Sequence, residues 1–87
     1  MIFIGLAKAK KKPSKEFFEQ GNRMMNELKS RGIKVLGWYM TLGRYDAVLV
    51  YEAENEKEAL KVSFAGGDLV SVETLVAVRR EEVAKFV

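Results

Sequence analysis

The sequence predicts a single α+β domain, residues 1–87, with the element order β-α-β-β-α-β. Three observations lead to this fold class. Four short runs are rich in Val, Ile and aromatic residues, which favours strands. Two longer segments repeat apolar residues every three or four positions, which favours helices. The second half of the chain repeats the strand-helix-strand pattern of the first.

The first half of the chain is predicted to hold a strand, a helix and a second strand. Residues 1–7 form the first apolar run. Ser14, just after Pro13, is placed to cap the start of a helix, and Gly32 supplies the positive φ at which helices often stop. The expected inward face of this helix carries Phe17, Phe18, Gly21, Met24, Met25 and Leu28. The second strand follows at residues 34–42.

A tight turn is predicted to join the second strand to the third, residues 45–53. Gly43 and Arg44 fit the loop of a type II′ turn, whose first residue has a positive φ. The register then places Thr41 opposite Asp46, and residues two apart share a face of the sheet. One face is expected to carry Leu36, Trp38, Met40, Leu42, Tyr45, Ala47, Leu49 and Tyr51, and the other Val35, Gly37, Tyr39, Thr41, Asp46, Val48, Val50 and Glu52.

The second half of the chain adds a helix and a last strand. Asn55 is predicted to cap the helix, with Glu58 at the third helical position completing a capping box. The glycine pair 66–67 ends this helix. Its expected inward face carries Ala59, Leu60, Ser63 and Phe64. The last strand, residues 69–78, is rich in Val, and a charged tail at 79–87 is expected to form one or two helical turns.

Two interleaved right-handed βαβ units form the ferredoxin-like arrangement, a four-stranded antiparallel sheet in the order 4-1-3-2 with two helices on one face. The opposite face would be apolar and uncovered, and soluble monomers rarely expose an apolar patch larger than about 300–600 Å². Burial of such a face at about 25 cal/mol per Å² outweighs the cost of association. We therefore expect a homodimer, or a multiple of one, with sheet against sheet as in a dimeric α/β barrel.

The composition excludes several classes of site. The chain has no cysteine and no histidine, so it has no disulfide, no thiol nucleophile and neither of the usual zinc ligands. We expect no metal and no cofactor. The longest uncharged run, residues 35–43, is far shorter than the roughly 20 residues of a membrane span, and the N-terminus does not have the pattern of a signal peptide. We expect a cytoplasmic protein with no membrane partner, and the high Lys and Glu content is typical of heat-adapted sources.

The positive charge of the chain is concentrated in one segment. Residues 8–15 contain five lysines and no acid, which leaves ten basic and twelve acidic residues elsewhere, a balance of −2 against +3 for the whole chain. Such a run is usually a solvated loop and less often a contact for an anion or a nucleic acid. The sequence leaves both interpretations open.

The segments "LGRYDAVLVYEAENEKEA" and "VETLVAV" resemble the GYD domain family, small ferredoxin-like proteins of the dimeric α/β-barrel kind. The family is named for a Gly-x-Tyr-Asp element, which falls here on Gly43, Tyr45 and Asp46. The resemblance covers nearly all of the chain and is weaker at residues 8–15, where family members more often carry a Trp-Thr turn. It implies the fold and the dimer, and it implies no defined activity.

Four residues are candidates for a ligand site: Tyr39, Tyr45, Asp46 and Glu73. The hypothesis is that Asp46, with a tyrosine and Glu73 nearby, projects into a pocket between the helices and the sheet and binds a polar ligand or moves a proton. The alternative is structural, in which the Asp46 carboxylate accepts a hydrogen bond from Thr41 or a backbone N–H and fixes the hairpin. Gly43 and Arg44 are then only turn residues.

Three classes of function remain. We favour a small-molecule-binding or sensing homo-oligomer without catalysis. The first alternative is a cofactor-free enzyme of the monooxygenase or isomerase type, with Asp46 as base and Tyr45 or Tyr39 as proton donor; the lack of a nucleophile–base pair counts against it. The second alternative is RRM-like RNA binding, because the element order is the same. The third strand counts against that alternative, since it has aliphatic residues where an RRM has aromatic ones.

Overall fold

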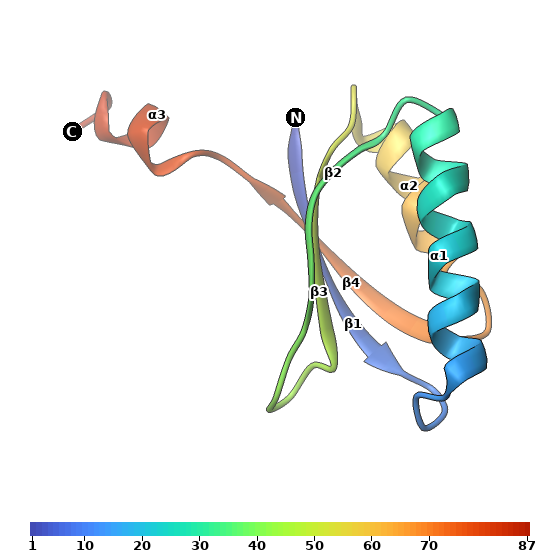
Figure 1. Cartoon of the computed structure of the whole chain (residues 1–87). Coiled ribbons are helices and arrows are strands. Elements are labelled where there is room, and N and C mark those ends of the chain that lie inside the picture. The colour runs from blue at the N-terminus through green and yellow to red at the C-terminus, as the bar shows by residue number, and fades with distance from the viewer.

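The computed structural model describes all 87 residues. Its elements are β1 (Ile2–Ala9), α1 (Lys15–Ser30), β2 (Lys34–Met40), β3 (Ala47–Glu52), α2 (Glu56–Ala65), β4 (Val70–Ala77) and α3 (Arg80–Ala84). The four strands form one antiparallel sheet in the order β2-β3-β1-β4, which is the predicted order read from the other edge. Helices α1 and α2 lie against one face, and the other face, called here the open face, is uncovered (Figure 1). The predicted α+β ferredoxin-like fold is confirmed.

The helices begin and end where local chemistry places them. The Ser14 hydroxyl accepts a hydrogen bond from the Phe17 N–H at 3.2 Å, and Asn55 accepts one from the Glu58 N–H at 3.0 Å. The Glu58 side chain bonds Lys61 at 2.6 Å, so the predicted capping box is formed on one side only. Gly32, with φ at 82°, follows the end of α1 as expected.

The predicted inward faces of the helices are partly wrong. In α2 the buried residues are Ala59 and Val62, while Leu60 and Phe64 point outward and Phe64 is 76% exposed. In α1, Phe18 is half exposed. Adjacent helical residues point about 100° apart, so only one residue of a neighbouring apolar pair can face the sheet. Helix α2 therefore packs on the sheet through the smaller residues Ala59 and Val62, and its larger apolar side chains face solvent.

A β-bulge in β2 reverses the predicted alternation at the start of that strand. Val35 pairs with Tyr51, but Gly37 pairs with Val50, so Leu36 is an extra residue without a partner on β3. An extra residue moves the side chains that precede it to the opposite face. Val35 therefore packs on the core with Tyr51, and Leu36, predicted on that side, lies on the open face and is 42% exposed.

The core lies between the sheet and the two helices. Phe3 and Tyr51, register partners on β1 and β3, stack with their ring centroids 5.6 Å apart, and both are fully buried. Burial raises the pKa of Tyr51, and the nearby Thr74 hydroxyl partly opposes this shift. The rest of the buried core is Leu28, Ile33, Leu49, Ala53, Ala59 and Val62. Because successive strand residues point to opposite faces of the sheet, the residues on either side of these core positions lie on the open face.

The open face is mainly aliphatic. By register with the buried strand positions, it carries Ile2, Ile4, Leu6, Leu36, Gly37, Tyr39, Val48, Val50, Ser71, Leu75 and Ala77, together with the charged residues Lys8, Lys34, Glu52 and Glu73. This composition is typical of a surface that another apolar surface covers. No helix in the chain combines the length and the apolar character that crossing a membrane requires.

Candidate functional site

The turn between β2 and β3 has the predicted register. Gly43 has a φ of 100°, which favours glycine, and the Thr41 N–H donates to the Asp46 carbonyl at 2.9 Å. The Thr41 hydroxyl donates to the Tyr45 carbonyl at 2.7 Å. Both bonds join Thr41, before the turn, to the residues that follow the turn, and neither involves Gly43 or Arg44 at its tip.

The Asp46 carboxylate has a structural partner. It accepts a hydrogen bond from the Ala9 N–H at 2.7 Å, and the Asp46 N–H donates to the Ala7 carbonyl at 2.8 Å. Of the two partners expected for a structural carboxylate, Thr41 and a backbone N–H, the structure contains the second. The bond joins the hairpin to β1, the strand on the other side of β3.

Tyr45 and Glu73 are brought together on the open face. The Tyr45 hydroxyl donates to the Glu73 carboxylate at 2.5 Å. This bond is the main cause of a raised pKa of Tyr45, and desolvation and the negative charge of Glu73 contribute less. Glu73 lies opposite Leu6, which is on the open face. The prediction that Tyr45 shares a face of the sheet with Trp38 is therefore wrong, because Trp38 lies on the helix-facing side. Tyr45 precedes β3, which begins at Ala47, and its side chain does not follow the alternation of that strand.

Tyr39 stands apart from the other three candidates. It is 60% exposed, and no hydrogen bond joins it to Tyr45, Asp46 or Glu73. Its ring lies over Gly37, where an added Cβ would approach the Tyr39 Cε2 atom to 2.7 Å. The four predicted residues thus do not meet in a pocket between the helices and the sheet. A ligand role for any of them stays a prediction.

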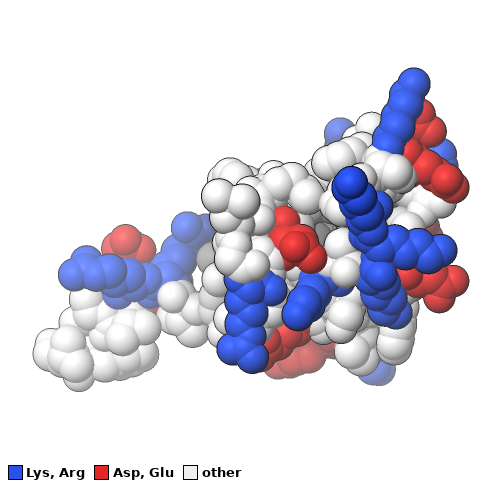
Figure 2. Space-filling view, turned by 90° about the horizontal axis from the view of Figure 1, so that it is seen from below, with Lys and Arg blue, Asp and Glu red and all other residues white.

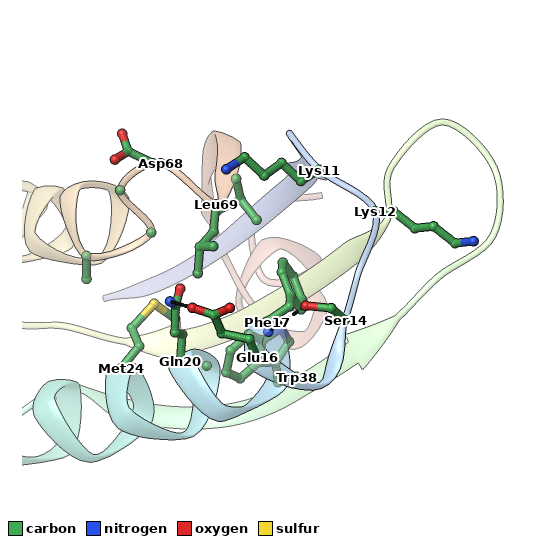
Figure 3. Close-up of a pocket in the computed structure, with 15 residues that line it drawn as sticks. Lys11, Lys12, Ser14, Glu16, Phe17, Gln20, Met24, Trp38, Asp68 and Leu69 are labelled. Carbon is green, nitrogen blue, oxygen red and sulfur yellow. Dashed lines mark hydrogen bonds between the residues drawn. The ribbon is translucent and has the colours of Figure 1, made fainter.

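A cleft elsewhere was missed by the sequence analysis. It lies between the start of α1, the β1–α1 loop and the α2–β4 loop, and has a volume of about 470 Å³ (Figure 3). Small-ligand sites typically have volumes of about 300–1,000 Å³. Phe17, Met24 and Trp38 supply large apolar side chains to its wall, and none of the four predicted site residues lines it.

Three glycines line this cleft. An added Cβ at Gly21 would lie 3.0 Å from the Trp38 indole, so the absence of a side chain allows the indole to lie against α1. Gly66 and Gly67 line the opposite wall at the end of α2, and Gly67 has a φ of 52°. A smaller apolar cavity of about 50 Å³ also touches Trp38 and continues toward the sheet. The available sequence signal was Gly21, a glycine in the middle of a helix.

The rim of the cleft is polar. Gln20 donates to Glu16 at 3.1 Å along one side, and Asp68 lies on the other. Lys11 and Lys12 both line the cleft, and Figure 3 shows the Lys11 side chain extending over the cavity and the end of the Lys12 side chain pointing away from it. Neither lysine forms an ion pair with a carboxylate. The cleft therefore combines an apolar wall with one unpaired cation at its mouth.

The end of the molecule that holds the lysine run is basic on its surface. Figure 2 looks onto the molecule from below, and basic side chains stand out from it around a smaller number of acidic ones. Lys10, Lys11 and Lys12 are all exposed. No group of three or more His, Cys, Asp or Glu side chains in the chain is arranged to hold a metal ion. The exposed lysines of this end are accessible to solvent and to an anionic ligand.

Comparison with known proteins identifies the family and no activity. A comparison with curated proteins gave no match. The model of the GYD domain matches residues 4–87, which include both the Gly43–Asp46 turn and the cleft. The chain therefore belongs to the GYD domain family.

Proposed function

We propose that this protein is a small-molecule-binding domain that acts as a homodimer, with its ligand in the cleft beside Trp38. The observation that carries the proposal is the cleft itself, about 470 Å³ with Phe17, Met24 and Trp38 in its wall and Lys11 at its mouth. An apolar wall with a few placed polar groups is typical of sites for small ligands. The proposal includes no catalytic step.

The lining of the cleft indicates the chemistry of the ligand. Phe17 and Trp38 offer ring surfaces against which a flat apolar group can stack. Lys11 can pair with one carboxylate or sulfonate at the mouth. Glu16 and Asp68, also on the rim, disfavour a ligand with several negative charges. The preferred ligand is therefore a small aromatic or alicyclic molecule with a single anionic end.

Ligand binding in the cleft can be followed by tryptophan fluorescence, because Trp38 lines the cleft and is the only tryptophan in the chain. A suitable probe is anilinonaphthalene sulfonate, which has fused rings and one sulfonate. Saturable binding with energy transfer from Trp38 to the probe is expected. Phe17→Ala should weaken this binding about tenfold, the loss expected from one ring contact of roughly 1.4 kcal/mol.

The neighbouring phenylalanine supplies a matched control. Phe18 follows Phe17 on α1 but is half exposed and does not line the cleft. Phe18→Ala should leave the affinity for the probe within about twofold of the wild type. Equal losses from the two variants would place the probe in the adjacent hollow of about 180 Å³ that Phe18 lines together with Phe17 and Trp38. No loss from either variant would place the probe elsewhere, for example on the open face. Both outcomes would contradict the proposed site.

The homodimer is supported by the open face. Its aliphatic side chains include Leu6, Leu75 and the bulge residue Leu36, and the chain has no further element that covers them. A second copy placed sheet against sheet would bury them. Light scattering at micromolar concentration should give twice the 9.9 kDa mass of the chain. A stable monomer under these conditions would remove this part of the proposal.

One observation favours the cofactor-free enzyme as a second candidate. The Tyr45 hydroxyl and the Glu73 carboxylate are hydrogen-bonded at 2.5 Å, and such a pair can pass a proton to a substrate on the open face. If so, Tyr45→Phe and Glu73→Gln should each abolish turnover of any substrate found by screening, without changing probe binding in the cleft. RNA binding has no comparable support, because the two central strands, β1 and β3, present no aromatic side chain on the open face, only aliphatic and charged ones.

A further inference from the structure

The C-terminal arm, residues 78–87, has no cover within its own chain. It leaves the end of β4 and projects away from α1 and α2, on the side of the open face (Figure 1). Phe86 is 83% exposed, and Val78, Val83 and Val87 are also exposed. Helix α3 has only five residues, and a helix of this length is not stable in water without tertiary contacts.

The base of the arm contacts the sheet through one exposed ion pair. The Arg79 guanidinium pairs with the Glu52 carboxylate at 3.4 Å, and Glu52 lies on the open face opposite Ile2. Beyond this point the arm does not fold back on the body. A hollow of about 330 Å³ separates its base from the end of the sheet, with Met1 and Glu82 among its lining residues. The arm is thus directed outward and presents apolar side chains to whatever lies next to the open face.

From this arrangement we propose that the arm packs against a second copy of this chain. The inference rests on the proposed homodimer. The open face and the arm are two apolar surfaces on the same side of the molecule, so a single partner would cover both. In a two-fold pairing, each copy sends its arm onto the body of the other, and the contact is made twice.

The size of the chain supports a second copy that uses both surfaces. A stable interface takes about 800 Å² from each partner, which is about one eighth of the 6434 Å² surface of this chain. The open face also carries Lys8, Glu52 and Glu73, whose charges limit the apolar area that it can contribute alone. The arm adds Val83, Phe86 and Val87, so the two surfaces together supply the apolar centre of an interface.

The test compares two exposed phenylalanines on opposite sides of the molecule. Phe86→Ser removes the largest apolar side chain of the arm, and Phe64→Ser removes a similarly exposed one from the outer surface of α2. The dimer dissociation constant is measured by sedimentation over a dilution series. Phe86→Ser should raise this constant at least about tenfold, as expected for the loss of one buried ring. Phe64→Ser should leave it within about twofold.

Two further measurements make every outcome decisive. Truncation after Val78 should weaken the dimer at least as much as Phe86→Ser. The backbone amides of the arm should exchange slowly in the dimer and fast after dilution to monomer.

If Leu6→Glu on the open face dissociates the dimer while Phe86→Ser and the truncation do not, the sheet-to-sheet dimer stands and the arm proposal fails. If the wild type is a monomer throughout, both fail. If Phe86→Ser lowers the melting temperature without changing the dissociation constant, the arm packs on its own chain, which also overturns the proposal.

Discussion

The Asp46 carboxylate accepts a hydrogen bond from the N–H of Ala9, 37 positions earlier in the chain, at 2.7 Å. Ala9 is the last residue of β1, and its neighbour Lys10 donates its N–H to the Leu69 carbonyl on the other side. The Ala9 N–H thus bonds the Asp46 carboxylate in place of a backbone carbonyl, at the point where the pairing of β3 with β1 ends. The aspartate of the Gly-x-Tyr-Asp element has a physical role in this chain that requires no ligand.

This role predicts different effects for two substitutions at Asp46. Asp46→Asn keeps an acceptor oxygen and should change the free energy of unfolding by well under 1 kcal/mol, whereas Asp46→Ala should cost about 1 kcal/mol or more because the Ala9 N–H loses its partner. Urea unfolding of the two variants measures the difference. Equal stability of Asp46→Ala and the wild type would mean that water replaces the carboxylate at no cost. Loss of probe binding in Asp46→Asn would instead favour a functional aspartate.

A second prediction concerns the turn itself. Gly43 has a φ of 100°, and no atom lies within 4 Å of the position that a Cβ would occupy. Gly43→Ala therefore meets no steric obstacle, and its cost, about 1–2 kcal/mol, should come from backbone conformation alone. Arg44→Ala, at the adjacent exposed position, should have almost no effect on urea unfolding. A D-alanine introduced at position 43 by chemical synthesis should restore stability, and failure to do so would contradict a purely conformational role.

A third prediction follows from the Tyr45–Glu73 hydrogen bond. This bond raises the pKa of Tyr45 above its ordinary value of 10.0, so the folded chain holds the phenol proton to higher pH than the unfolded chain. The associated stabilisation is fully present below pH 10 and is lost as the pH rises through the folded pKa. Tyrosine titration by carbon NMR should show Tyr45 ionising late in the wild type and near its ordinary value in Glu73→Gln. An unchanged Tyr45 titration in that variant would mean that the bond does not persist in solution.

The parts of the fold that were predicted correctly depend on local chemistry. The caps at Ser14 and Asn55, the stop at Gly32 and the glycine turn at Gly43 each follow from the conformational preference of a few neighbouring residues. The strand order follows from the handedness of βαβ units. None of these inferences requires knowledge of how distant side chains pack.

The errors arise where packing decides the structure. The extra residue Leu36 leaves no mark in the alternation of β2, because Val35 and Leu36 are both apolar and either can face the core. Helix α2 has a similar ambiguity, because Leu60 and Phe64 are larger than the residues that actually face the sheet, Ala59 and Val62. Apolar pattern alone does not distinguish these alternatives.

The candidate site was predicted around the Gly43–Asp46 turn, whereas the cleft is formed by segments that meet only in the folded chain. Tyr45 and Glu73 do meet, because β3 and β4 flank β1 in the sheet. The cleft joins α1, β2 and the α2–β4 loop, which lie far apart in the chain. Gly21 was assigned to a packed helix face, and it does pack closely against the Trp38 indole. Only the structure shows that this contact forms part of the wall of a cleft.

The last prediction uses two adjacent lysines to test the mouth of the cleft. Both lysines line the cleft, are exposed and form no ion pair with a carboxylate. They differ in direction, because the Lys11 side chain extends over the cavity and the end of the Lys12 side chain points away from it (Figure 3). Lys11→Ser should therefore weaken binding of anilinonaphthalene sulfonate several-fold, while Lys12→Ser, which removes the same charge from the same loop, should have little effect. The loss of affinity should be smaller in high salt because salt screens the attraction between the lysine and the sulfonate at the cleft mouth.

Both variants should keep the wild-type melting temperature within a few degrees, since an exposed unpaired lysine contributes less than about 1 kcal/mol. Titration of the probe against Trp38 emission measures all three affinities. Equal losses from the two variants would show that the lysine run attracts the anion through its total charge and that Lys11 has no specific place in the site.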